Sequence, residues 1–216
     1  MSEPEVTKVV FFVRHGETTS NVAQVVQGLD DPLTERGRLQ ADTVAARATT
    51  LGFERLLSSD AVRAHDTAKA IAAQTGHDVE TTPLLREVRR PRSLIGTNRS
   101  GEAYQTFRQQ EHEHFFDPDW RMEDAENFFD TKTRVAELIT FLEEAPERRI
   151  LCVTHGHILR HIMSYLITGK QHEPAWWLHV AGSIQISNTG VSVFTYQDEA
   201  WQLLTWNDHS HFADAE

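Results

Sequence analysis

Two short apolar runs, far apart in the chain, each end close to a histidine that is followed by a glycine. The sequence VVFFV at residues 9–13 comes shortly before His15, and ILCVT at residues 150–154 comes directly before His155. Short apolar runs rich in β-branched and aromatic residues are typical of buried strands. Open α/β sheets bind ligands at the carboxyl ends of their parallel strands. If these two strands are neighbours, both imidazoles therefore face one ligand.

The residues at these strand ends suit a phosphate group. Arg14 presents a planar fork of N–H donors that matches phosphate oxygens, and His15 presents a nucleophilic nitrogen. Gly16 has no side chain, so the backbone there can come close to a ligand. The residues after Gly156 have helical spacing, and the N-terminus of such a helix would add backbone N–H donors.

The order of the predicted elements indicates an α/β protein. Thr34 is expected to cap a helix that runs to about residue 49, and Ser59 or Asp60 a helix that runs to about residue 74. Further strands are predicted at residues 55–58, 79–82, 183–187, 191–196 and 201–206. The last three are expected to form a hairpin and its extension. This alternation predicts a three-layer α/β/α fold with a mostly parallel central sheet.

We expect one domain over residues 1–216, because a chain of this length can bury a substantial core. The stretch from about residue 92 to 130 departs from the alternation, which indicates a lid insertion of helical and irregular structure. Its aromatic side chains suit two roles: they line a substrate site, or they pack as a small flap on the body of the protein. The two roles are compatible.

Composition limits the class of partner. The formal net charge of −11 argues against general nucleic-acid binding, and no apolar stretch is long enough to cross a membrane. Residues 1–5 are acidic and lack the pattern of a signal peptide. The single cysteine, Cys152, excludes an internal disulfide bond and lies in an apolar run typical of core. We therefore expect a cytoplasmic protein without nucleic-acid or membrane partners, and the sequence leaves a homodimer open.

Positive charge gathers in one part of this acidic chain. Five arginines lie within fourteen residues: Arg86, Arg89, Arg90, Arg92 and Arg99. They form either a solvated surface or the mouth of an anion-binding pocket.

The ordered motifs resemble the histidine phosphatase superfamily, also called the phosphoglycerate mutase-like family, over most of the chain. Residues 14–18 followed by Asn21 resemble its nucleophile motif, and Gln27-Gly28 with residues 33–41 resemble the loop and helix start that come next. Residues 57–68, around Arg63, resemble its second arginine motif.

The family's two remaining motifs are similar to segments further along the chain. Glu87, in Leu85-Arg86-Glu87, stands where the family carries its acid, and residues 153–156 match its second histidine.

The resemblance implies a metal-independent, cofactor-free phosphomonoesterase of the histidine acid phosphatase type, acting on a small phosphorylated substrate. His15 would attack phosphorus and form a phosphohistidine, which water then displaces. Arg14 and Arg63 would clamp the phosphoryl oxygens, His155 would donate a hydrogen bond, and Glu87 would protonate the leaving oxygen. Four more residues would complete the substrate-binding set: Asn21, Gln27, Gly28 and Gly156.

Several alternatives stay open. Glu87 would be a surface residue if it paired with the neighbouring arginines, and Glu17 is then the next candidate acid. The phosphoryl group would return to the substrate in a mutase of the same family, and a non-catalytic phospholigand-binding protein would keep only the fold. His157 and His161, four residues apart on a predicted helix, match a metal-ligand spacing, but a structural role for these histidines is favoured. The substrate itself is not determined.

Overall fold

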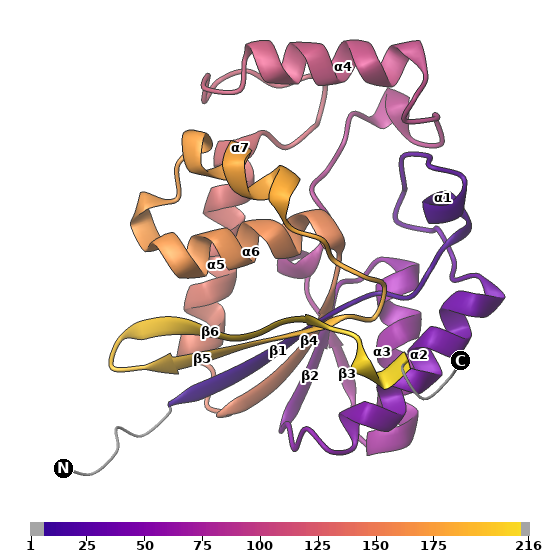
Figure 1. Cartoon of the computed structure of the whole chain (residues 1–216), viewed down its shortest axis with the longest axis vertical. Coiled ribbons are helices and arrows are strands. Elements are labelled where there is room, and N and C mark those ends of the chain that lie inside the picture. The colour runs from indigo at the N-terminus through magenta and orange to yellow at the C-terminus, as the bar shows by residue number, and fades with distance from the viewer. Residues whose placement is uncertain (1–6, 213–216) are drawn as a thin grey trace.

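The computed structural model describes residues 7–212, in which a six-stranded sheet lies between two layers of helices (Figure 1). The strand order is β3-β2-β4-β1-β5-β6. The strands are β1 (Lys8–Arg14), β2 (Arg55–Ser58), β3 (Val79–Thr81), β4 (Arg149–Thr154), β5 (Val191–Gln197) and β6 (Ala200–Asp208). The first four run parallel, and β5 and β6 add an antiparallel pair beside β1. The predicted fold class is confirmed.

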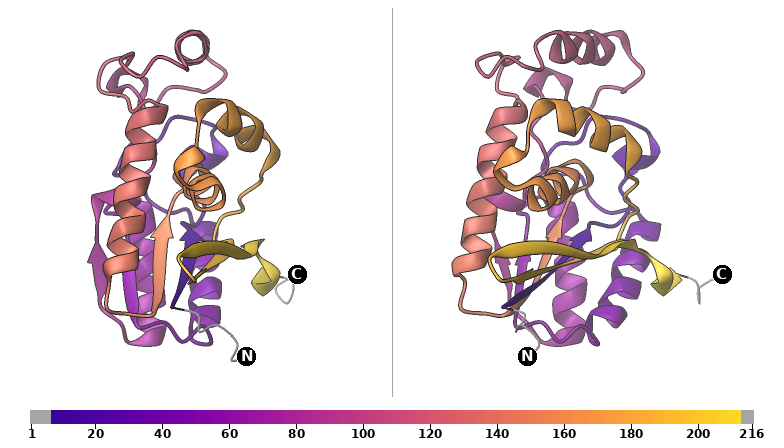
Figure 2. Two further views of the ribbon diagram at one scale, coloured as in Figure 1. Left: turned by 90° about the vertical axis from the view of Figure 1, so that its left-hand side faces the viewer. Right: turned by 60° about the vertical axis from the view of Figure 1, so that its left-hand side comes forward.

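Helices cover both faces of this sheet, as the turned views in Figure 2 show. The α-helices are α1 (Thr19–Val22), α2 (Glu35–Ala48), α3 (Val62–Thr75), α4 (Glu102–Glu113), α5 (Phe128–Glu144), α6 (Gly156–Thr168) and α7 (Pro174–Ser183). Short 3₁₀ turns are η1 (Pro83–Leu85), η2 (Arg92–Leu94), η3 (Gly169–Gln171) and η4 (Ser210–Phe212). No helix in the described part of the chain combines the length and apolar character needed to cross a membrane.

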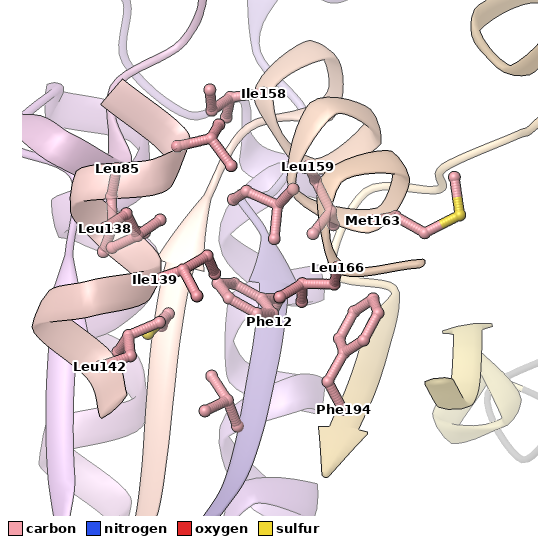
Figure 3. Packing of buried hydrophobic residues seen from close by; sticks show 14 of the residues in the cluster. Phe12, Leu85, Leu138, Ile139, Leu142, Ile158, Leu159, Met163, Leu166 and Phe194 are labelled. Carbon is pink, nitrogen blue, oxygen red and sulfur yellow. The ribbon is translucent and has the colours of Figure 1, made fainter. Parts of the chain in front are cut away.

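The core explains why the first apolar run is a central strand. Alternate residues of β1 point to opposite faces, so Val10 and Phe12 pack with α5 and α6, whereas Phe11 and Val13 pack with α2 and α3. A parallel strand buried on both faces has to be apolar throughout. Figure 3 shows Phe12 at the centre of the first cluster, among side chains of α5 and α6.

The helix caps were predicted with mixed success. Thr34 caps α2 as expected, because its Oγ1 accepts the N–H of Gly37 at 2.9 Å. The predicted cap of α3 is wrong: the N-cap residue is Ala61, which makes no side-chain cap bond. Ser59 and Asp60 have other partners, since Ser59 contacts His155 and Asp60 forms an ion pair with Arg86.

The predicted hairpin has the wrong partner strand. Residues 184–187 form no strand, and β5 pairs instead with β6 around Asp198 and Glu199. Both turn residues have positive φ, at 50° and 60°, which suits the right-handed twist of a tight hairpin. The expected turn at Asn188-Thr189-Gly190 serves another purpose. It binds the end of β1, where Thr189 N–H donates to the Arg14 carbonyl at 2.9 Å.

The insertion forms its own small cluster. Phe107 of α4 packs with Val26 and Leu94, and the partly buried Trp120 joins them. Figure 1 and Figure 2 show α4 apart from the sheet, beyond the strands' carboxyl ends. Asn127 caps α5, so the insertion ends near residue 127 rather than 130.

Gly16 is required by a close approach of two backbone segments, a role that the sequence analysis did not foresee. A Cβ atom at Gly16 would lie 2.4 Å from the carbonyl oxygen of Gly37, and one at Gly37 would lie 2.0 Å from that of Glu17. The two glycines therefore allow the turn after β1 to pack on the first turn of α2. The turn is also tied to α3, because Gly16 N–H donates to Thr67 Oγ1 at 3.1 Å.

Replacing Gly16 with alanine is expected to lower the free energy of unfolding by about 1–3 kcal/mol, the usual cost of overpacking. The new methyl group meets backbone, which cannot move aside as a side chain can. Urea denaturation measures the change. Gly182→Ala is the matched control, because a Cβ there meets nothing within 4 Å and alanine favours helix. Equal stability of the Gly16 variant and wild type would contradict the packing argument.

Candidate active site

A cavity of about 610 Å³ opens at the carboxyl ends of β1 and β4. The wall includes Arg14 and His15 at the end of β1, Arg63 from α3, Glu87 after η1, and Gly156 at the start of α6. Four separate segments of the sequence thus meet at one edge of the sheet.

Strand pairing brings the two histidines together, because β1 and β4 are adjacent and parallel with Arg14 opposite Thr154. The ring centroids of His15 and His155 lie 5.0 Å apart. Both side chains are buried, with 1% and 0% of their surface exposed. His15 lines the cavity, whereas His155 is fully buried beside it and is not among the lining residues.

The environment of His15 leaves one ring nitrogen with a lone pair. Nδ1 lies 2.7 Å from the Gly16 carbonyl, which can only accept, so Nδ1 carries the proton. Burial lowers the pKa of His15 well below 6.5, and the guanidinium groups of Arg63 and Arg14 lower it further. The ring is therefore neutral at pH 7, and Nε2 is available as a nucleophile.

The guanidinium groups of the half-buried Arg14 and the buried Arg63 line the same cavity as this ring, and backbone carbonyls hold both. Arg14 donates to the Ile186 carbonyl and Arg63 to the Gly28 carbonyl, each at 2.6 Å. Among the described residues neither forms an ion pair, and the Nε atom of each is buried without a partner. Burial lowers the pKa of Arg14 to about 10, so both groups remain charged at pH 7.

His155 is a second neutral imidazole with an unused nitrogen. Its Nε2 lies 2.8 Å from Ser59 Oγ, whereas its Nδ1 is buried without a partner among the described residues. Burial, Arg63 and His15 all lower the pKa of His155 well below 6.5. Ser59 Oγ accepts from Ala61 N–H at 3.3 Å, and in the tautomer in which its hydroxyl donates to Nε2 the Nδ1 atom carries the proton and is a donor.

Glu87 lies at the N-terminus of α6, where its carboxylate accepts three backbone N–H bonds. Oε1 binds Val88 N at 2.9 Å and Ile158 N at 2.8 Å, and Oε2 binds His157 N at 3.0 Å. Glu87 therefore binds two of the backbone N–H groups at the start of α6 that we expected a phosphate to bind. Within residues 7–212 Glu87 forms no ion pair with a neighbouring arginine, which removes the surface alternative.

The other predicted substrate-binding residues also line the cavity, but several hold the site together. Gly28 fixes Arg63 through its carbonyl, and Asn21 Oδ1 caps α1 by accepting Thr18 N–H at 3.2 Å. Gln27 donates to Thr18 Oγ1. Glu17, the alternative acid, does not line the cavity and instead accepts from Thr34 Oγ1 at 3.0 Å.

Three supporting residues were missed by the sequence reasoning. Ser59 orients His155, Thr67 joins Gly16 to the Arg63 carbonyl, and Asn188 donates to the His15 carbonyl at 2.9 Å. A signal existed for the first two, because Ser59 directly follows a predicted strand and Thr67 lies one helical turn after Arg63.

The arginine cluster and the insertion form the cavity mouth. All five clustered arginines line the cavity, together with Ile95, Tyr104 and Asp124 from the insertion. Most aromatic side chains of the insertion pack on one another instead, and Tyr104 is the one that reaches the wall.

The histidines of α6 pack into an aromatic cluster. The ring of His161 stacks on Trp177 with centroids 3.5 Å apart, and His157 and His172 lie against the same indole. The described residues contain no group of three or more histidine, cysteine, aspartate or glutamate side chains placed to hold a metal ion.

Comparison with known proteins gives one family and several similar chains. Residues 10–209 match the model of the histidine phosphatase superfamily, branch 1. A protein of Proteus mirabilis named probable phosphoglycerate mutase GpmB is 32% identical over 218 aligned residues, which cover 95% of each chain.

Solved structures share the fold. A mycobacterial glucosyl-3-phosphoglycerate phosphatase is 26% identical, with a TM-score of 0.74 over 93% of this chain and 98% of that one. A putative alpha-ribazole-5'-P phosphatase of Escherichia coli, 24% identical, has a TM-score of 0.75 over 93% and 97% of the two chains, and shows the fold alone.

Proposed function

The chain belongs to the histidine phosphatase superfamily, and from this we propose that it hydrolyses a phosphate monoester through a phosphohistidine at Nε2 of His15. The observation that carries the proposal is the set of unused donors around this ring. Nε of Arg14, Nε of Arg63 and Nδ1 of His155 are all buried, and none of them has a hydrogen-bond partner within residues 7–212. Leaving a buried donor unpaired costs about 1–3 kcal/mol, so three around one nucleophile favour an anionic ligand.

The reaction proceeds in two displacements. In the first, the Nε2 lone pair forms a bond to phosphorus while the bond to the leaving oxygen breaks, and protonated Glu87 gives its proton to that oxygen. In the second, Glu87 takes a proton from water, the water oxygen bonds to phosphorus, and the bond to Nε2 breaks. Inorganic phosphate leaves and His15 is regenerated. Arg14, Arg63 and His155 bind the phosphoryl oxygens in both transition states.

The test measures phosphate release from a panel of phosphorylated metabolites, followed by trapping of the labelled enzyme. Labelled substrate should leave an acid-labile, base-stable phosphoryl group on the peptide that contains His15. A panel without phosphate release, or a label on another residue, would overturn the proposal.

Phosphoglycerate mutase activity is the second candidate, because proteins named probable phosphoglycerate mutase are 32% identical to this chain. A mutase returns the phosphoryl group of His15 to a second hydroxyl of the substrate. The two activities separate when 3-phosphoglycerate is supplied with and without the corresponding bisphosphate. A mutase interconverts the 2- and 3-phosphate esters faster than it releases phosphate, and a phosphatase does the reverse.

Activity is expected to survive an excess of EDTA. Arg14 and Arg63 supply fixed positive charge at the transferring phosphoryl group, which is the role that a metal ion has in many other phosphatases. Turnover with and without the chelator measures this. Loss of activity that a divalent ion restores would contradict the prediction.

We also propose that residues 92–127 act as a lid on a single domain. The insertion supplies both charged and apolar residues to the cavity mouth, where the leaving group of the substrate would lie. This position favours a role in substrate choice.

A further inference from the structure

The cavity carries far more positive charge than one phosphate requires. Nine arginines and three carboxylates line it, although the chain as a whole has a formal net charge of −11. The carboxylates are Glu87, Asp124 and Glu126. A phosphate monoester brings two negative charges, and Arg14 with Arg63 already match these.

Most of the remaining arginines are paired within the protein. Four form ion pairs with carboxylates: Arg86 with Asp60, Arg90 with Glu111, Arg92 with Asp124 and Arg134 with Glu126. Arg89 donates through Nε to the Asp124 carbonyl. Among the described residues Arg99 and Arg160 have no carboxylate within ion-pair distance, and both line the cavity.

The backbone places Arg160 beside the phosphoryl-binding arginine. Arg160 lies one turn after Gly156 on α6, and its Nε donates to the Ile184 carbonyl at 3.0 Å. Arg14 donates to the carbonyl of Ile186, only two residues further along. Two residues span at most about 7 Å, so the two carbonyls that hold these guanidinium groups lie within about that distance of each other.

The charges in this part of the cavity repel one another. Burial lowers the pKa of Arg14, Glu87 opposes this, and both Arg160 and Arg99 lower it further. Burial also lowers the pKa of Arg160, which Glu87 raises in turn. Arg160 therefore lies within electrostatic reach of the carboxyl group that serves the leaving oxygen.

We propose that Arg160, with Arg99 at the mouth, binds a second anionic group on the leaving-group side of the substrate. The substrate is then a phosphate monoester that also carries a carboxylate or a second phosphate. Val26, Ile95 and Tyr104 line the same cavity and would cover the carbon atoms between the two groups. This inference rests on the proposed phosphatase function.

The test uses matched pairs of esters with the same spacer. One pair is 4-phosphooxybutanoate and its amide; the other is butane-1,4-diyl bisphosphate and 4-hydroxybutyl phosphate. The readout is the ratio of kcat/KM for the anionic member to that for the neutral member, corrected for the two equivalent phosphates of the bisphosphate. A preference in the first pair identifies a carboxylate, and one in the second pair a phosphate.

Wild-type protein is expected to favour the anionic member of at least one pair by about 10- to 100-fold, the value of one or two charge-assisted hydrogen bonds. Arg160→Gln should lower this ratio by about tenfold, and Arg160→Lys should retain most of it. Arg99→Gln should lower it less, by about threefold, because Arg99 is exposed and screened by solvent.

Arg92→Gln is the matched control, because it removes the same charge from the same mouth but its side chain is 86% exposed and paired with Asp124. Its ratio should stay within about twofold of wild type, since exposed pairs contribute little. Circular dichroism confirms that each variant is folded.

The outcomes separate the two proposals. A wild-type ratio near one, with His15-dependent hydrolysis of the neutral esters, overturns the second-anion site and leaves the phosphatase function. An Arg160→Gln variant whose kcat/KM falls equally for the anionic and the neutral ester also overturns the site. If no ester is hydrolysed, the phosphatase function fails. The second-anion site is then tested by calorimetry, which compares the affinities of the His15→Ala variant for the anionic and the neutral member of each pair. Equal affinities would overturn the site.

Discussion

Replacing His15 with alanine is expected to lower kcat by about 10⁴-fold or more, as removal of a nucleophile does in other covalent enzymes. The reason is local and specific. Nδ1 of His15 is bound to the Gly16 carbonyl, so Nε2 is the only ring nitrogen with a lone pair, and its neutral state is secured by burial and two guanidinium groups. Alanine leaves the arginines in place but provides no atom to accept the phosphoryl group.

Two measurements make this prediction specific. Labelled substrate should leave no phosphoryl group on the variant, and the variant should still bind vanadate through Arg14 and Arg63. His112→Ala is the control: His112 is exposed on α4 and does not line the cavity, so turnover should match wild type. A His15→Ala variant with kcat within tenfold of wild type would place the nucleophile elsewhere.

The second large effect is expected for Glu87→Gln, and it depends on the leaving group. A departing alkoxide is a strong base and needs a proton, whereas a nitrophenolate does not. Loss of the acid should therefore lower the rate of hydrolysis of alkyl phosphates by about 10²–10⁴-fold. The phosphorylation of His15 by p-nitrophenyl phosphate should fall far less. Because the same carboxylate activates water, a burst of nitrophenol followed by slow turnover is the expected signature.

The structure adds a control for this experiment. The carboxylate of Glu87 accepts three backbone N–H bonds, and an amide nitrogen at one of its oxygen positions would face a donor, so the free energy of unfolding is measured in parallel. Glu126→Gln removes the same charge from the cavity wall, and its losses should not depend on the leaving group. Equal losses of Glu87→Gln on both ester types, without a burst, would show that this carboxyl group only holds α6.

Local patterns predicted the parts of the protein that depend on neighbours in sequence. The run at residues 9–13 is apolar because β1 is buried on both faces, and Thr34 caps α2 because its hydroxyl needs only the N–H three residues later. The family follows from short ordered motifs, and the match over residues 10–209 confirms it. The meeting of His15 and His155 followed from topology, since parallel strands end at one sheet edge.

Contacts between distant segments were beyond these patterns. Ser59 looked like a helix cap, but it contacts His155, which is 96 residues away. Asn188 looked like a hairpin turn, but it binds the end of β1. In both cases the local preference of a polar residue was met by a partner that only the folded chain brings near. Gly16 likewise must lack a side chain because the carbonyl of Gly37 packs against it, and no local sequence pattern links these two residues.

The sequence by itself therefore determined the parallel strands and the family, and it supplied the candidate residues for the chemistry, because each depends on burial periodicity or on short motifs. Tertiary structure alone decided the state of those residues. The neutral ring of His15, the buried Nε atoms of Arg14 and Arg63 that have no partner within residues 7–212, and the two nearby carbonyls that hold Arg160 and Arg14 all depend on contributions from remote segments. Desolvation and charge act through space, so their effects appear only when the fold has set the distances.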